Sequence, residues 1–550
     1  MRARASDRSQ DFTIALPLVI LLCSLFVVLL AANGPSFLSA TTRAHFFPQW
    51  IAGPLARSLP WFTPSNRTLE SIFTGVVIVS FASYLLGVAR VSKLSARSII
   101  LTILAVQLVF VLSPPLTLTD VFNYINYARM EVVHNLDPYA TIPALEPHRD
   151  PAFALSNWHN LLSPYGPLFT ILMFAIVPFG VAASFWLAKI SLAICSLACL
   201  WFISRCAQLL QVDPKRALFY AGLNPLVLLW GLGGDHNDLA MMFFILLALH
   251  LLLRGTPPSV RSSIGAGQPQ PVELRPFARE ATFKDPVSKD AALKDPALKD
   301  PALKDPALKD PAPNDAALQD PRLKDARLGR LRQIPFTVLL RPLWLELAAG
   351  AALAAAVFVK ASAGIIIPVI IAGLLRTPRR AVQTILGGLL ATVSLGLVSY
   401  LVFGAHLPGI GTQGSIVTDF SLPNLLGLAL GQGGETHTLR TLLLAALVLA
   451  VLGCCIAAFR SGDFISWSGW ATIALLVTLA WVLPWYIVWV LPLAALSRSR
   501  RLHIATVAMC VYLIVVWVPS SSQLWKAIGF EPQQTVVGQV NHRYVNELLH

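Results

Sequence analysis

The chain has 550 residues, of which 55% are apolar and 13% are charged, and its mean hydropathy is +0.65. A soluble chain carries about 25% charged residues, so a single water-soluble domain, a disordered chain and a disulfide scaffold are excluded. The net charge is +14, but the basic residues form short clusters between apolar segments. This distribution is typical of membrane topology signals, so we expect a lipid bilayer as partner and no nucleic acid.

Continuous apolar runs follow one another along the whole chain. Runs of about 20 residues cross a bilayer as helices. The sequence therefore predicts an all-α fold, a polytopic helical membrane protein with about 13 spans. The runs cover residues 13–32, 70–89, 98–113, 182–204, 217–232, 238–253, 343–359, 361–375, 382–403, 439–459, 466–483, 485–497 and 503–519.

Basic residues stay on the cytoplasmic side of a membrane, which orients the spans. With the N-terminus inside, the basic clusters face the cytoplasm on the condition that the apolar stretch 166–178 does not cross. As a helix this stretch would reach only about 20 Å, against a hydrocarbon core of about 30 Å. The run 13–32 follows three arginines without a cleavage site, so we expect a retained span.

The hydropathy pattern predicts four parts of the chain. Residues 1–254 form an N-terminal transmembrane region with the external loop 114–165, residues 342–519 form a C-terminal transmembrane region, and 520–550 form an external tail. Between them, 255–341 is a cytoplasmic low-complexity insertion with KDPAL repeats. Proline in every repeat prevents a regular helix, so the insertion is expected to be a semi-extended linker, with partner docking as the alternative.

Ionisable groups at the membrane are costly and indicate function. In loop 114–165, Asp120 follows a Pro-Pro break, and a helix starting there would carry Tyr124 one turn on and Arg129 further along. The alternative is that Asp120 is simply a helix cap and that Arg129 lies on a solvated face.

A second polar turn, Gly233-Gly234-Asp235-His236-Asn237-Asp238, separates two apolar runs at the predicted outer boundary. Its alternatives are a plain turn in which Asp238 caps the next helix, or a metal site of Asp235, His236 and Asp238. Three such neighbours are weak evidence for a metal, so we expect none.

Lys189 and Lys360 are lone cations in apolar runs, near their predicted outer ends. Such lysines usually extend to the lipid headgroups, and they would bind a phosphate only if both reached one cavity. Trp485 and Tyr486 lie at another outer turn, where aromatic residues are typical of the membrane boundary.

The ordered set of motifs resembles the GT-C superfamily of polytopic glycosyltransferases, and most closely the prokaryotic polyprenol-phosphate-mannose-dependent α-mannosyltransferases. Asp137-Pro138-Tyr139 stands where the family has Asn-Pro-Tyr, and the insertion departs from the family pattern. The motifs are Asp120-x-x-x-Tyr124, Asp137-Pro138-Tyr139, Ser163-Pro164-Tyr165-Gly166-Pro167-Leu168, Asn224-Pro225, His236-Asn237-Asp238, Lys360, and Trp485-Tyr486 with Trp489 and Leu491-Pro492.

The resemblance implies a multi-pass enzyme of the inner (plasma) membrane with an extracytoplasmic active site, using a polyprenyl-phosphate-linked sugar donor and a glycan or glycolipid acceptor. It implies neither metal nor cofactor. By position, Asp120 would be the catalytic base. The expected substrate-binding residues are Tyr124, Arg129, Asp137, Tyr139, Tyr165, Lys189, Asp235, His236, Asn237, Asp238, Lys360, Trp485 and Tyr486.

The expected reaction is an inverting transfer of a hexose, taken to be mannose. The alternative is a transporter or flippase for a lipid-linked or small polar substrate. Transporters have internal repeats and polar groups at the membrane midplane. This chain has no obvious repeat, and its polar motifs gather at one predicted face, which favours the enzyme.

Overall fold

The computed structural model describes residues 2–39, 48–117, 120–261, 264 and 344–549. Within these residues the chain forms helices, turns and loops, with one isolated bridge between Ser39 and Leu116 and no strand. The predicted all-α class is confirmed. Residues 265–343, which hold most of the predicted insertion, lie outside the described residues.

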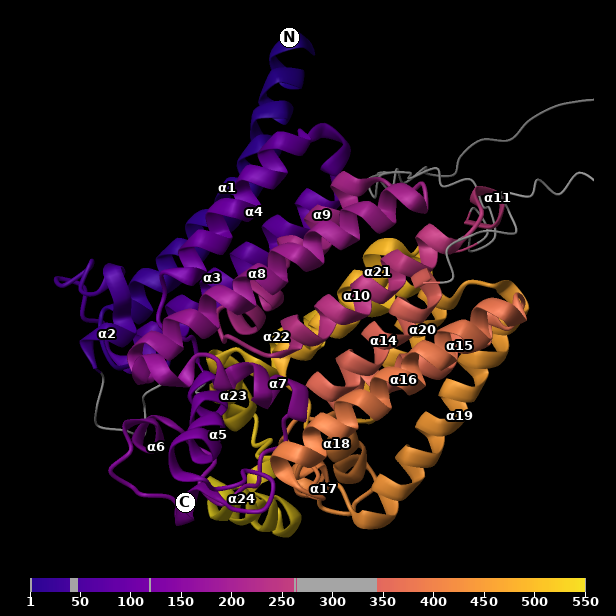
Figure 1. Cartoon of the computed structure of the whole chain (residues 1–550). Helices are drawn as coiled ribbons and strands as arrows, with labels where there is room; N and C mark the ends of the chain where they lie inside the picture. The colour runs from indigo at the N-terminus through magenta and orange to yellow at the C-terminus, as the bar shows by residue number, and fades with distance from the viewer. Residues whose placement is uncertain (1, 40–47, 118–119, 262–263, 265–343, 550) are drawn as a thin grey trace, which may run out of the picture. The chain divides into compact units, whose positions relative to one another are not determined.

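Figure 1 shows the helices of both halves of the chain. In the first half they are α1 (Arg2–Ala32), α2 (Gln49–Ala52), η1 (Gly53–Leu55), α3 (Asn66–Ala89), η2 (Val91–Lys93), α4 (Ala96–Val111), α5 (Asp120–His134), η3 (Pro143–Leu145), α6 (Pro151–Leu155), α7 (Pro167–Phe174), η4 (Val177–Phe179), α8 (Gly180–Leu209), α9 (Pro214–Gly222), the π-helical η5 (Val227–Leu232), α10 (Asp238–Gly255) and α11 (Pro258–Arg261). In the second half they are α14 (Trp344–Val359), η7 (Ala361–Ile366), α15 (Ile367–Leu374), α16 (Pro378–Phe403), α17 (Ile410–Ser415), α18 (Leu422–Ala429), α19 (His437–Ser461), α20 (Phe464–Thr478), η8 (Pro484–Trp489), α21 (Leu491–Leu496), α22 (Arg500–Trp517), α23 (Pro519–Ala527), η9 (Pro532–Gln534) and α24 (Val536–Leu549).

Seven helices of the described residues are long and apolar enough to cross a membrane, namely α1, α3, α8 with η4, α10, α16, α19 and α22. Five more predicted runs form shorter apolar helices: α4, α14, η7 with α15, α20, and η8 with α21. The protein is thus an all-α polytopic membrane protein, and the number of 13 spans stays a prediction. In the stretch 166–178, α7 has eight residues, which as a helix is too short to cross.

The sequence sets several helix starts locally. Ser65, Ser95 and Ser499 accept hydrogen bonds from backbone N–H groups in the first turns of α3, α4 and α22. Such side chains satisfy donors that the helix itself leaves free. Asp120 is the first residue of α5.

Small residues let two helices of the second half approach closely. α14 packs on α16 (Figure 1), and a Cβ added to Gly350 would lie 1.9 Å from the Thr384 carbonyl oxygen. A Cβ on Gly387 would likewise lie 2.0 Å from the Leu347 carbonyl oxygen. Close packing through small residues is typical of membrane helices, and it holds α14, whose end carries Lys360, in a defined position.

The C-terminal helix α24 packs on the loop that holds α5. The backbone N–H and the side-chain amide of Asn160 donate to the carbonyl oxygens of Leu548 and Glu547, at 3.0 and 2.8 Å. The Tyr544 hydroxyl also lies 3.0 Å from Ser415 Oγ. The tail after residue 520 therefore lies at the same end of the molecule as the loop.

Candidate active site

The backbone brings the polar turn 233–238 against the segment that leads into α5. The Leu116 N–H donates to the Gly233 carbonyl oxygen at 2.7 Å. A Cβ on Gly233 would lie 2.5 Å from the Leu229 carbonyl oxygen, and one on Gly234 would lie 2.3 Å from that of Trp230. The two glycines are therefore required for the chain to fold back tightly on the π-helical η5.

Asp120 and His236 meet at this junction. His236 Nδ1 lies 3.2 Å from Asp120 Oδ2, and the side-chain amide of Asn123 donates to Asp120 Oδ1 at 3.3 Å. The Asp120 side chain is 17% exposed and that of His236 only 1%. A substrate can therefore reach the carboxylate, while the imidazole orients it from behind.

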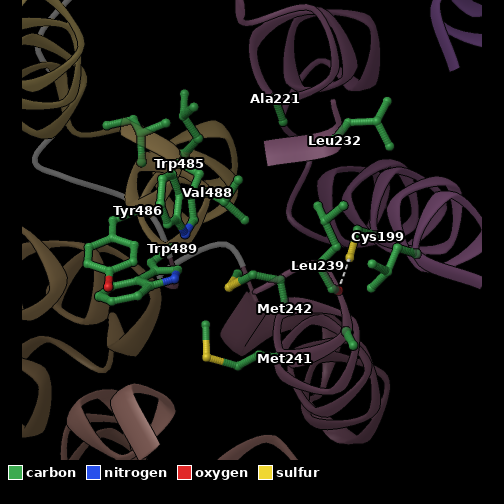
Figure 2. Packing of buried hydrophobic residues seen from close by; sticks show 14 of the residues in the cluster. Cys199, Ala221, Leu232, Leu239, Met241, Met242, Trp485, Tyr486, Val488 and Trp489 are labelled. Carbon is green, nitrogen blue, oxygen red and sulfur yellow. Dashed lines mark hydrogen bonds between the residues drawn. The ribbon is translucent and has the colours of Figure 1, made fainter. Parts of the chain in front are cut away.

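Aromatic side chains form the wall behind His236. The Trp485 ring stacks on the imidazole with centroids 3.7 Å apart, and Figure 2 shows Trp485, Tyr486 and Trp489 from η8 together. On the other side, the Tyr124 hydroxyl accepts a hydrogen bond from the Asn237 N–H at 3.2 Å. Burial, and next the charge of Asp120, raise the pKa of Tyr124 well above its ordinary value, so this hydroxyl keeps its proton.

Tyr165 belongs to the same wall. Its ring packs edge-on against Tyr124, with centroids 4.6 Å apart. The next residue, Gly166, anchors this segment, because its N–H donates to the Val359 carbonyl oxygen at 3.1 Å. A Cβ on Gly166 would lie 2.1 Å from the Phe358 carbonyl oxygen, so glycine is needed for this contact with the end of α14.

The two lysines do not extend to the headgroups as lone cations; each pairs with an acid of the turn. Lys189 Nζ lies 3.0 and 2.9 Å from the two Asp235 carboxylate oxygens, and both side chains are buried. Lys360 Nζ lies 2.9 Å from both Asp238 oxygens. A buried charge needs such a partner because desolvation is costly. The acids of the turn thus face two different lysines.

The two pairs differ in accessibility. The Lys189 side chain is 1% exposed, whereas that of Lys360 is 16% exposed. Lys360 also lies over the rings of Tyr486 and Trp489, at 5.1 and 5.5 Å. Lys360 can therefore contribute its charge to a bound anion, whereas Lys189 is enclosed in the protein.

Several buried polar atoms beside Asp120 have no hydrogen-bond partner within the described residues. They are His236 Nε2, both side-chain amide atoms of Asn237, and Trp485 Nε1. Buried polar atoms are nearly always paired, and exceptions require an explanation. Four such atoms on neighbouring side chains offer donors and acceptors with which a polar ligand could form hydrogen bonds.

An apolar groove of about 380 Å³ opens next to Lys360. It lies between the start of α7, the end of α14 and the end of α16. Its lining residues are Pro164, Gly166, Pro167, Val357, Phe358, Ala361, Gly396, Ser399, Tyr400, Gly404, Ala405, His406, Leu407 and Pro408. The groove shares Gly166 with the aromatic wall and reaches Ala361, the neighbour of Lys360.

Three predicted substrate-binding residues have other partners in the structure. The Arg129 guanidinium binds Asp150 through Nε and one terminal nitrogen, at 2.8 to 3.1 Å. Asp137 lies 2.6 Å from His406 Nδ1, and the Tyr139 hydroxyl donates to the Tyr165 carbonyl oxygen. Arg129 is also nine residues along α5 from Asp120, which is about 13 Å. These residues brace the loop and do not meet Asp120.

Residues outside the predicted set also shape the site. The Asn123 side chain, one turn after Asp120, is fixed by the Asn157 side chain at 2.8 Å and accepts from the Asn157 N–H at 3.0 Å. The Trp489 indole N–H donates to Asp238. In the sequence, the i, i+3 spacing of Asn123 from Asp120 indicates that the two side chains share one helix face. No local pattern connects Trp489 to Asp238.

Comparisons with known proteins find family matches in two parts of the chain. Residues 24–275 match the family described as alpha-(1->6)-mannopyranosyltransferase, N-terminal domain, and residues 418–541 match the MptB C-terminal domain. Asp120 and the turn 233–238 lie in the first match, and η8 lies in the second. Lys360 lies between them.

Two curated relatives show similarity over part of the chain. The chain is 27% identical over 219 residues to a protein of Mycolicibacterium smegmatis named "Probable alpha-(1->6)-mannopyranosyltransferase", covering 38% of this chain and 37% of that protein. It is 29% identical over 160 residues to alpha-(1->6)-mannopyranosyltransferase A of Corynebacterium glutamicum, covering 28% of this chain and 32% of the relative. The matches thus span only about a third of these relatives.

No solved structure matches the chain significantly. The two family matches together cover about two thirds of the sequence. The chain belongs to the alpha-(1->6)-mannopyranosyltransferase (MptA/MptB) family, a GT-C-like family of polytopic membrane proteins.

Proposed function

We propose that the protein is a membrane glycosyltransferase that moves a hexose, mannose, from a polyprenyl-phosphate-sugar donor to a glycan or glycolipid acceptor on the extracytoplasmic side. The names of the relatives support the sugar. The observation that carries the proposal is the accessible carboxylate of Asp120 beside four buried, unpartnered polar atoms. Sugar hydroxyls, which both donate and accept hydrogen bonds, suit such atoms.

Asp120 acts as the general base. The acceptor hydroxyl attacks C1 of the donor hexose and gives its proton to Asp120 as the new C1–O bond forms. The bond from C1 to the phosphate oxygen breaks, and the lipid phosphate leaves with that electron pair. A single displacement of this kind inverts the anomeric carbon. His236 and Asn123 hold the two carboxylate oxygens in position for the proton.

The charge that develops on the leaving phosphate needs a cation nearby. Of the two lysines that pair with acids of the turn, Lys360 is the one that keeps an exposed surface. Asp238 and the rings of η8 hold its position. Lys189, enclosed with Asp235, stabilises the turn instead. Asp120 and Lys360 thus flank the turn 233–238 and supply the base and the cation.

The apolar groove next to Lys360 suits the isoprenoid chain of the donor. Its walls are mostly apolar, and Tyr400 and Leu407 are 60% and 80% exposed at its edge. A lipid tail lying here would remove these surfaces from contact with other lipids while its phosphate lies at the Lys360 end. This explains why a sugar-transferring enzyme carries its site at the end of apolar helices.

The test is transfer of radiolabelled mannose from a polyprenyl-phosphate-mannose donor in membranes that contain the full chain. We expect the Asp120→Asn protein to lose transfer by about a hundred-fold or more, since a general base contributes a factor of about 10² to 10⁴. Asp419→Asn is the matched control, because Asp419 lies in the C-terminal half and pairs with His542.

The same membranes, as sealed vesicles, separate the enzyme from a transporter. Uptake of the labelled lipid or sugar without formation of a glycosidic product would overturn the proposal. An Asp120→Asn protein with full transfer activity would remove the base assignment alone.

A further inference from the structure

A second cavity lies at the far ends of two helices of the candidate site. α10 begins at Asp238 and has 18 residues, so its other end is about 27 Å away along the helix axis. There, α8, α10 and α11 enclose a cavity of about 510 Å³. Its polar lining includes Arg205, Gln208, His250, Arg254 and Arg261.

Three arginines line this cavity, namely Arg205, Arg254 and Arg261. None of the ion pairs among the described residues includes Arg205 or Arg254. Arg261 is held in place by the carbonyl oxygens of Thr256 and Arg254, at 2.7 and 3.3 Å. Like charges around one cavity repel one another, and an anion with several oxygens relieves this repulsion and matches the planar donors of arginine.

A buried polar atom in the wall points to the same kind of ligand. His250 is 9% exposed, and its Nδ1 has no hydrogen-bond partner within the described residues. Its ring packs beside Trp201 and Phe202, with centroids 5.7 and 5.5 Å away. The Arg205 guanidinium in turn lies 5.4 Å from the Trp201 ring. These contacts fix the arginine and the imidazole before a ligand arrives.

An exposed apolar stripe runs along α8 from the cavity. Ile190, Ile194 and Trp201 are 43%, 60% and 51% exposed. Their spacing of four and seven residues puts them on one face of the helix. α8 with η4 is one of the candidate membrane spans, so this face suits acyl chains, and a tryptophan at its end is typical of the headgroup level.

We propose that this cavity binds the phosphate of an anionic phospholipid, whose acyl chains lie along the exposed face of α8. The site is at the opposite ends of α8 and α10 from Asp120, so it faces the opposite leaflet. Basic pockets between membrane helices bind anionic headgroups in this manner. The proposal is independent of the sugar-transfer activity.

The test is native mass spectrometry of the full chain in detergent with added phosphatidylglycerol or phosphatidylcholine. We expect preferential binding of phosphatidylglycerol, and a loss of about 25-fold in its affinity in the Arg205→Gln/Arg254→Gln protein, at about fivefold per arginine. The matched control, Arg97→Gln/Arg501→Gln, removes the same charge at exposed positions outside the cavity. Thermal unfolding of both proteins checks that they are folded.

Three results would overturn the proposal. They are equal affinity for the two lipids, an equal loss in the control protein, or complete displacement of the lipid by inorganic phosphate, which would indicate a site for free phosphate. If the double variant does not fold, Trp201→Ala serves instead. This variant is expected to lower the affinity for phosphatidylglycerol, and unchanged binding would contradict the acyl-chain path along α8.

Discussion

At the scale of single residues, the turn 233–238 is organised by charge. Asp235 and Asp238 each meet one lysine from another helix, while His236 between them meets Asp120. Asp235 has a φ of 56°, in the left-handed region that aspartate and asparagine adopt more readily than most residues. The alternating directions of these side chains separate the buried structural pair from the accessible part of the site.

Lys189→Met is expected to destabilise the protein by about 3 kcal/mol or more, because it leaves the Asp235 carboxylate buried without a partner. Unfolding in detergent micelles measures the effect. The double variant Lys189→Met/Asp235→Asn should recover much of the loss, since asparagine is uncharged and tolerates the same φ. A stable Lys189→Met protein with a raised KM for the donor would instead assign Lys189 to the phosphate.

Glu146 predicts a pH dependence of the loop. Its carboxylate accepts from the Asn126 side chain at 2.7 Å, and burial raises its pKa to about 7. Because the folded state favours protonated Glu146, this residue contributes its full stabilisation below the pKa that it has in the unfolded chain. The contribution is lost as the pH rises through about 7. Thermal unfolding from pH 5 to 8 should show this decline, and Glu146→Gln should reduce it. An unchanged slope in Glu146→Gln would refute the assignment.

At the scale of elements, α14 and its neighbours set the position of Lys360. Gly350 and Gly387 let α14 and α16 approach each other, and Gly166 connects the end of α14 to the aromatic wall. These contacts are to backbone oxygens, which cannot rotate away as a side chain would. The distance between the lysine and the carboxylate therefore depends on residues that carry no chemistry.

Gly387→Ala is expected to cost about 1 to 3 kcal/mol of stability, because the added methyl group forces α14 and α16 apart. Gly453→Ala in α19 is the control: a Cβ there meets nothing within 4 Å, so the change is expected to be neutral or slightly stabilising. Denaturant unfolding of the two proteins compares them. Equal stability of both variants would show that α16 shifts without cost.

At the scale of the whole molecule, the loop after α5 and the C-terminal helix lie at one end of the described fold. The candidate site is at the same end, and the arginine-lined cavity is at the far ends of α8 and α10. The excess of basic residues predicts that the second end is cytoplasmic.

Cysteine labelling tests this orientation. Leu145 and Val540 are 70% and 58% exposed, so Leu145→Cys and Val540→Cys should react with a membrane-impermeant maleimide in intact cells. Arg501→Cys, at the start of α22, should react only after permeabilisation. The reverse pattern would put the site on the cytoplasmic side and exclude an extracytoplasmic transfer.

The sequence alone determined the all-α class and most of the apolar segments that become the longer helices. A hydrocarbon environment offers no hydrogen-bond partners, so a continuous apolar run must satisfy its backbone internally. It also singled out Asp120, the turn 233–238, Lys360 and Trp485, because polar and aromatic groups at membrane helix ends are few and stand out.

Only the tertiary structure decided how these groups pair. Lys189 and Asp235 are 46 residues apart, and Lys360 and Asp238 are 122 residues apart. No local pattern specifies such pairs, since they depend on the angle and register at which helices pack. For that reason the sequence placed Lys189, Lys360 and Arg129 together among the expected substrate-binding residues, without telling their roles apart. Burial and the distances to Asp235, Asp238 and Asp150 distinguished the accessible lysine from the two cations that hold the fold together.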